Sequence, residues 1–136
     1  MRNYDKPCLI ERIVASTSYA TLGMVGFVWL IIVAVTKGNL KSFLKYHIFQ
    51  SFFLVMGYFL LTKFVGFLVS ILGIIPFINM LVFKLLFIFN APMIFGFSII
   101  NFAVLSGMVY LILTSIQGKY SYVPWISNII DANVQR

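Results

Sequence analysis

The order of apolar and charged residues along the chain predicts a series of membrane-length helices. Residues 13–36 carry no charged side chain. This run of 24 residues is long enough to cross a bilayer, because a helix rising about 1.5 Å per residue needs about 20 residues to do so. The segment 37–41 follows, with Gly38-Asn39 as a turn signal between two lysines. We therefore expect a first membrane-spanning helix over 13–36.

A second long apolar segment starts at Ser42 and contains Lys45 and Lys63 as its charged residues. No turn-forming residues surround Lys63, so we expect one helix over 42–72 that ends at the Gly73–Pro76 break. The alternative places a tight turn at Lys63 and adds a span. A lysine at the bilayer centre costs about 2.5–3.5 kcal/mol, so in a continuous helix Lys63 must snorkel or face other protein.

The rest of the apolar region predicts two more helices. Asn90-Ala91-Pro92 interrupts it, and proline disfavours helix at its own position and at the residue before. We expect a third helix over 77–90 and a fourth over 93–116, with Gly118 as its C′ glycine. The predicted fold is an all-α integral membrane protein with about four transmembrane or hydrophobic helices. It has a polar N-terminus (1–12), a multi-pass helical membrane domain (13–118) and a polar C-terminal tail (119–136).

Composition supports a lipid environment. The chain is 62% hydrophobic and 10% charged, against roughly 45–50% and about 25% in soluble domains. Its net charge of +7 comes from bases scattered singly between apolar runs, which favours contact with anionic headgroups over binding of nucleic acid. The positive-inside rule gives a tie across the first predicted span: Arg2, Lys6 and Arg12 precede it, and Lys37, Lys41 and Lys45 follow it.

The residue types that carry most catalysis are scarce. Cys8 is the single cysteine, His47 is the single histidine, and no acidic residue lies between Glu11 and Asp131. A zinc site usually needs three or four ligands, and general acid–base chemistry usually needs a carboxylate or histidine partner. We therefore expect no catalytic residues, no metal and no cofactor.

The densest polar patch at a predicted membrane edge runs from Lys41 to Ser51. Lys41 and Lys45 lie on one helix face, and His47 and Gln50 share another. The favoured interpretation is an interfacial turn, with the lysines at headgroups and the His-Gln pair bonded to neighbouring backbone. The alternative is a contact site for a substrate, made by Lys45, His47 and Gln50.

Asparagines and small residues mark candidate helix contacts. Asn79, Asn90 and Asn101 recur every eleven residues, about three helical turns, and would form one stripe on a continuous helix. We favour interhelical hydrogen bonding for them; the alternative is a polar strip along a water-filled path. The small pairs Ser16–Ala20 and Ala103–Gly107 permit close helix packing.

Three short segments carry a resemblance to a known family. They are ERIVASTSY at 11–19, KYH followed by Gln50-Ser51 at 45–51, and the tail GKYSYVPWISNIIDA at 118–132. In the tail, Gly118, Pro124 and Asp131 are the most specific positions. Together these segments resemble the Tic-twenty family, the twenty-kilodalton subunit of the translocon at the inner chloroplast envelope with its cyanobacterial and other bacterial relatives. The resemblance implies four transmembrane helices, both termini on the stromal or cytoplasmic side, and membership of a preprotein translocon.

We therefore expect a noncatalytic membrane subunit of a protein-import complex, in the plastid inner envelope or the bacterial inner membrane. Its partners would be lipid, other translocon subunits and preproteins. A small structural or assembly subunit of another membrane complex is the second interpretation, and a small-solute transporter or channel is the third. The tail is expected to dock a partner through the face listed here: Trp125, Ile126, Ile129 and Ile130.

Overall fold

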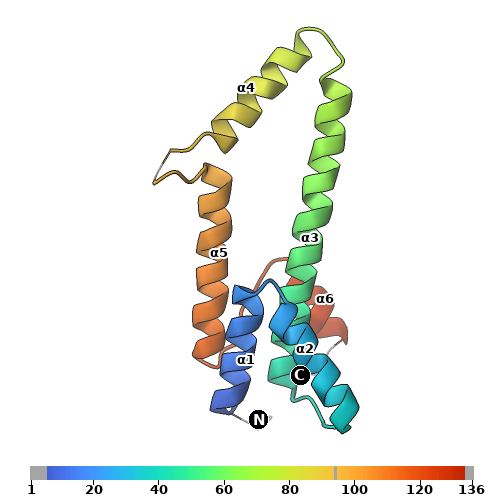
Figure 1. The fold of residues 1–136 in the computed structure, drawn as a ribbon, viewed down its shortest axis with the longest axis vertical. Helices are drawn as coiled ribbons and strands as arrows, with labels where there is room; N and C mark the ends of the chain where they lie inside the picture. The colour runs from blue at the N-terminus through green and yellow to red at the C-terminus, as the bar shows by residue number, and fades with distance from the viewer. Residues whose placement is uncertain (1–5, 94, 134–136) are drawn as a thin grey trace. The chain divides into compact units, whose positions relative to one another are not determined.

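The computed structural model describes residues 6–93 and 95–133, and all its elements are helices. They are α1 (Leu9–Ala20), α2 (Met24–Thr36), α3 (Ser42–Leu72), α4 (Ile78–Asn90), α5 (Ile99–Ile116) and α6 (Ile126–Asn133) (Figure 1). The chain divides into two compact units. Unit 1 comprises Met1–Met56 with Met108–Arg136, and unit 2 comprises Gly57–Gly107. The all-helical class predicted from the sequence is confirmed.

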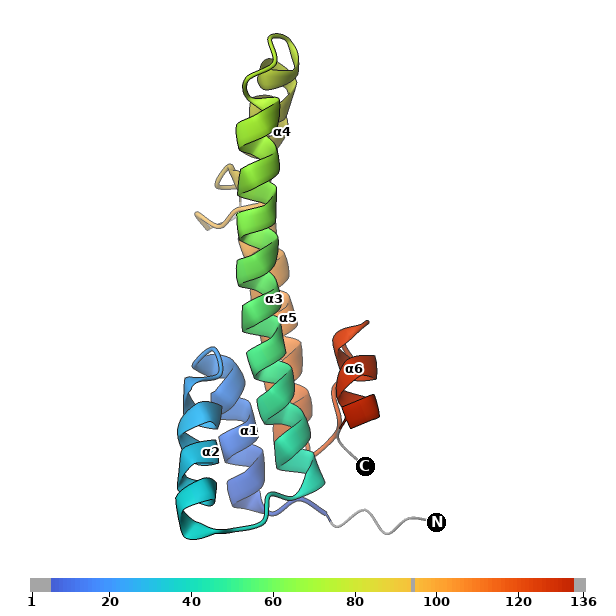
Figure 2. The same ribbon diagram turned by 90° about the vertical axis from the view of Figure 1, so that its right-hand side faces the viewer.

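The single helix predicted over 13–36 is wrong, because unit 1 begins with a helical hairpin. The helices α1 and α2 lie side by side and run in opposite directions (Figure 2). The helix α1 ends in a Schellman motif: Leu22 has φ +53°, and the Gly23 N–H donates to the Ser18 carbonyl at 2.6 Å. The hydroxyl of Thr21 then accepts the N–H of Val25, in the first turn of α2, at 3.2 Å. At 12 and 13 residues, each helix is shorter than the roughly 20 residues of a span.

The hairpin resolves the tie in positive charge. A straight helix over 13–36 would separate its flanking bases by about 36 Å. Instead, Lys41 Nζ lies 3.2 Å from Glu11 Oε1, so the beginning of α1 and the beginning of α3 meet at one end of unit 1. Arg12 also lies at this end, against Gly118 after α5. We call this the basic end of unit 1.

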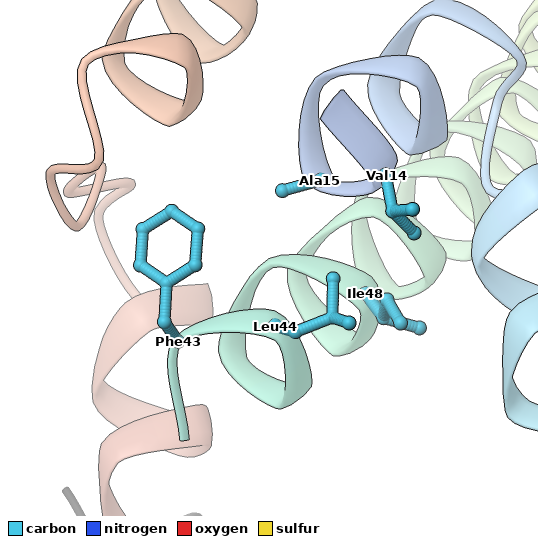
Figure 3. Close-up of a cluster of buried hydrophobic side chains, with 5 residues drawn as sticks. All are labelled: Val14, Ala15, Phe43, Leu44 and Ile48. Carbon is cyan, nitrogen blue, oxygen red and sulfur yellow. The ribbon is translucent and has the colours of Figure 1, made fainter. Parts of the chain in front are cut away.

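The apolar core of unit 1 joins α1 to the first turns of α3. Its buried members are Val14 and Ala15 from α1 and Phe43, Leu44 and Ile48 from α3 (Figure 3). Gly26 brings α2 against both helices, because a Cβ there would lie 2.9 Å from Ser18 Oγ and 3.1 Å from Ile48 Cγ2.

The long second helix is confirmed, because α3 spans Ser42–Leu72 without a turn at Lys63. Lys63 is exposed, and its Nζ lies 5.4 Å from the centroid of the Phe59 ring, a cation–π distance. By length and composition, two of the described helices, α3 and α5, are long and apolar enough to cross a membrane.

Unit 2 contains the later part of α3, all of α4 and the beginning of α5. The third helix is found one residue shorter than predicted. The fourth begins at Ile99 instead of residue 93, because Ser98 caps it: its Oγ accepts the Asn101 N–H at 3.3 Å. In the described part of unit 2, Ser98 is the single buried residue, and large apolar side chains such as Phe77 are exposed.

The tail after Gly118, predicted only as a polar segment, contains a helix. It crosses unit 1 as an irregular segment and then forms α6 over Ile126–Asn133. Gly118 is a C′ glycine as predicted, with φ +71°. Its N–H donates to the Ser115 carbonyl, and the Lys119 N–H donates to the Thr114 carbonyl, each at 3.0 Å, which is a Schellman motif.

Candidate functional site

Unit 1 encloses a cluster of buried polar side chains, which we call the polar core. Its members come from α1, α3, the segment after α5, and α6, and each is at most 3% exposed. Burial of so many polar groups is favourable only when each one is hydrogen-bonded. The members are Tyr19, Tyr46, His47, Gln50, Ser121 and Ser127.

Gln50 lies at the centre of the polar core. Its Oε1 accepts hydrogen bonds from the Ser121 hydroxyl and the Tyr19 hydroxyl, each at 2.7 Å. Its Nε2 donates to the Ser121 carbonyl and to Ser127 Oγ, each at 3.3 Å. One side chain on α3 therefore connects α1, the segment after α5, and α6.

His47 links the same elements through its two ring nitrogens. Its Nε2 lies 3.2 Å from the Lys119 carbonyl oxygen, which accepts only, so Nε2 carries the proton. Its Nδ1 lies 2.8 Å from the Tyr19 hydroxyl. The ring stacks on Tyr120 with centroids 6.1 Å apart and lies 4.4 Å from the Phe43 ring. The single histidine is thus hydrogen-bonded through both ring nitrogens and packed against two aromatic rings that also contact each other.

Tyr19 has one hydroxyl proton for two acceptors, His47 Nδ1 and Gln50 Oε1. Burial raises the pKa of the Tyr19 phenol above its ordinary value, so the hydroxyl stays protonated and remains a donor. In a neutral imidazole whose Nε2 is protonated, Nδ1 is an acceptor. The single Tyr19 proton therefore has two acceptors within hydrogen-bond distance, both on α3.

Tyr46 fixes the tail. Its hydroxyl donates to the Ser121 carbonyl at 2.7 Å and lies 2.8 Å from Ser127 Oγ. The Ser127 hydroxyl oxygen also accepts the Val123 N–H at 2.8 Å. Below it, Ile130 packs against the Tyr46 ring. These contacts hold α6 against the first turns of α3.

The side chains of the polar core are suited to holding the elements of unit 1 together by hydrogen bonds. Every buried side-chain nitrogen and oxygen in the described part of the chain has a hydrogen-bond partner. Within residues 6–93 and 95–133, no three histidine, cysteine or acidic side chains gather as a metal site would require. The groups that remain are hydroxyls, one amide and one imidazole, each bonded to another element of unit 1.

The structure separates the three candidate residues at the start of α3. His47 and Gln50 are each fully buried in the polar core, where they bond to the backbone of residues 119 and 121. Lys45 instead is exposed and lines a cavity between α3 and α6. In the favoured interpretation, His47 and Gln50 bond to neighbouring backbone; both do bond to backbone, but at residues more than seventy positions away along the chain.

The tail candidates fall outside the polar core. Gly118 lies against the N-terminal segment, because a Cβ there would be 2.9 Å from Arg12 Nε and 3.0 Å from Pro7 Cγ. Pro124 is exposed, and its carbonyl accepts the Ile126 N–H at 2.9 Å as α6 begins. Asp131 is half-buried in α6.

The predicted docking face of the tail is only partly available. Ile130 is 1% exposed, and both Ile130 and Ile126 belong to the cluster around Tyr46, so these two side chains face the chain's own α3. The remaining two are accessible: Trp125 is 83% exposed and Ile129 is 50% exposed. The prediction that these four residues form a single partner-binding face is therefore wrong.

The prediction that the three asparagines form one stripe is also wrong, because they do not lie on one continuous helix. Asn79 and Asn90 lie on α4, whereas Asn101 lies on α5 after a break of eight residues, 91–98. Asn79 Nδ2 donates to the Gly73 carbonyl and Asn90 Nδ2 to the Leu86 carbonyl, each at 2.9 Å. Two of the three amides thus satisfy local backbone groups, and the break before α5 separates Asn101 from them.

Sequence reasoning missed four members of the polar core: Tyr19, Tyr46, Ser121 and Ser127. Tyr46 was readable, since it shares a helix face with Gln50 four residues later. Ser121 and Ser127 gave no signal, because they lie in a segment without helical periodicity or at the first turn of α6.

No family model matches this chain, and neither the curated proteins nor the solved structures include a match.

Proposed function

We propose that this chain is a noncatalytic, multi-pass membrane subunit of a protein-import complex of the Tic-twenty type. The single observation that carries the proposal is the composition of the polar core. The three segments that resemble the family each contribute to it: Tyr19 from the first, Tyr46, His47 and Gln50 from the second, and Ser121 with Ser127 from the third. Short motifs that are far apart in sequence and meet in one buried network form a joint signature.

A membrane location is supported by the two long apolar helices, α3 and α5, and by the exposed apolar side chains of unit 2. Contiguous exposed apolar surface of this kind requires lipid or a partner. The basic end of unit 1 supplies an orientation. Because positive charge concentrates on the cytoplasmic side, we place this end in the stroma or the bacterial cytoplasm.

The polar core gives the subunit a part in which the tail folds back on the helices. It holds the segment after α5 and α6 against α3, and it leaves Trp125 exposed with a positive φ of +67°. A large aromatic side chain presented by an ordered turn is a typical contact residue at protein interfaces. We assign Trp125 and the surface of the tail to contacts with neighbouring subunits.

The test is site-specific photo-crosslinking in the native membrane. The probe replaces Trp125, and a matched probe replaces Lys37, which is also exposed in unit 1 but lies on the hairpin. We expect the Trp125 probe to recover translocon subunits or arrested preproteins, and the Lys37 probe to recover fewer. Recovery of an unrelated assembly from Trp125 would support the structural-subunit interpretation instead, and no crosslinked protein from either position would refute the proposal.

A further inference from the structure

A cavity of about 240 Å³ lies between α3 and α6 in unit 1, beside the polar core but outside its hydrogen bonds. Ile130, which is 1% exposed, forms part of its wall, whereas Ile129 is half exposed at its edge. The cavity is lined by Lys45, Phe49, Phe53, Ile129, Ile130 and Asn133.

The lining changes from charged to apolar along one face of α3. Lys45, Phe49 and Phe53 are spaced four residues apart, so they form one row. At about 1.5 Å per residue, the row extends about 12 Å along the helix. Its charged member lies nearest the basic end of unit 1, and its aromatic members lie toward the apolar part of α3.

This gradient matches an amphiphile with a negative head. Lys45 is exposed, and a lysine ammonium attracts phosphate as a point charge. Phe49 and Phe53 are half-buried and offer their rings to the cavity. A ligand without charge would leave Lys45 unused, and a free anion would leave the apolar wall uncovered.

We propose that this cavity binds an acidic phospholipid of the surrounding bilayer. The headgroup phosphate lies at the Lys45 ammonium, and the first part of one acyl chain lies along Phe49 and Phe53. The volume is below the roughly 300–1,000 Å³ of pockets that enclose a whole small ligand, so the lipid is held by part of its length. The inference rests on the membrane location in the proposed function and is independent of translocon membership.

The test measures lipid that stays with the full-length chain. The protein is reconstituted in nanodiscs of phosphatidylcholine with a minor fraction of phosphatidylglycerol, extracted gently and analysed by native mass spectrometry. We expect retained phosphatidylglycerol to fall about fivefold in Lys45→Gln, the change expected when one lysine contact to an anionic headgroup is removed. Lys37→Gln is the matched control, because Lys37 is exposed in unit 1 and does not line the cavity.

A second variant fills the cavity without changing its charge. Ile129→Trp puts a larger side chain at the half-exposed edge, and we expect it to lower retention of phosphatidylglycerol while the circular dichroism spectrum stays unchanged. Equal retention by the wild type and Lys45→Gln would overturn the inference, as would an equal loss in Lys37→Gln. Failure of membrane fractionation would refute the proposed function itself, whereas crosslinks to subunits with unchanged lipid retention would refute only the lipid site.

Discussion

Units 1 and 2 are built from the same kinds of residues but bury them differently. In unit 1 the helices satisfy one another: α1, α3 and the tail share an apolar core and the polar core. In the described part of unit 2, Ser98 alone is buried. The apolar side chains described in unit 2 are exposed or half-buried, which is the surface expected of helices that contact lipid or a partner.

The hydroxyl groups show the same contrast. In unit 1, Ser121 and Ser127 bond to side chains more than seventy residues away. In unit 2, Thr62, Ser70 and Ser106 each donate to the carbonyl four residues earlier, at 2.8–2.9 Å. Such local bonding means that these three hydroxyls need neither water nor a neighbouring element as a partner. Long-range polar bonds thus define the part of the chain that folds on itself.

The largest effect is expected from Gln50→Leu. Leucine removes both acceptor and donors at the centre of the polar core, so the Ser121 hydroxyl and the Ser127 hydroxyl each lose a partner. We expect the free energy of unfolding of unit 1 to fall by about 3 kcal/mol, since each orphaned buried group costs about 1–3 kcal/mol. Thermal unfolding in detergent, followed by circular dichroism, measures it.

Asn90→Leu is the matched control in unit 2. Asn90 is an exposed amide that donates only to a carbonyl of its own helix. We expect its unfolding transition to match that of the wild type. A destabilisation by Asn90→Leu as large as that by Gln50→Leu would abolish the distinction between a self-satisfied unit and an exposed one.

A smaller effect is expected from Gly26→Val. Its added carbons would meet Ser18 Oγ and Ile48 at 2.9–3.1 Å, and overpacking of this kind costs about 1–3 kcal/mol. Gly107→Ala in unit 2 is the control, because no described atom lies within 4 Å of a Cβ placed there. Alanine in that helix interior should stabilise the chain by about 0.5–1 kcal/mol.

Gly107 also tests where unit 2 is packed. If Gly107→Ala leaves the purified chain stable but weakens its association with crosslinked subunits, the Ala103–Gly107 pair contacts a partner helix, as small pairs do. Unchanged association would assign this face of α5 to lipid. Either result defines what surrounds unit 2.

The sequence predicted helices well where charge and proline punctuate it. The helix α3 has the predicted bounds, and α4 and the end of α5 lie within one residue of them, because Gly73, Pro92 and Gly118 are strong local signals. The hairpin was missed because Leu22-Gly23 lies within an uncharged run. A Schellman turn needs one residue with positive φ, and hydropathy does not report it.

Two of the six members of the polar core, His47 and Gln50, could be picked out from the sequence. They are polar residues in an apolar chain, and a buried polar group needs a hydrogen-bond partner. Their partners Ser121 and Ser127 could not be found, because long-range pairing depends on the tail returning to α3. That return is determined by packing around Tyr46 and Ile130, and no local pattern encodes it.

The smallest effect is expected from Asn101→Leu. Asn101 is exposed on α5 in unit 2, and exposed sites usually change stability by less than about 0.5 kcal/mol. We expect unchanged unfolding and unchanged assembly, measured by thermal unfolding and by crosslinking to subunits. If the chain serves protein import as proposed, import should also be unchanged, because the three asparagines form no continuous strip.

An import defect in Asn101→Leu with normal assembly would support the alternative of a water-filled path. Asn101 of unit 2 would then be one of the polar groups that line it. A loss of stability above about 1 kcal/mol would mean that Asn101 has a partner as the polar-core residues do, since that is the usual cost of a lost buried hydrogen bond. Since Asn101 is exposed on α5, we expect neither result. The surface of unit 2 around Asn101 would then contact its surroundings through apolar packing.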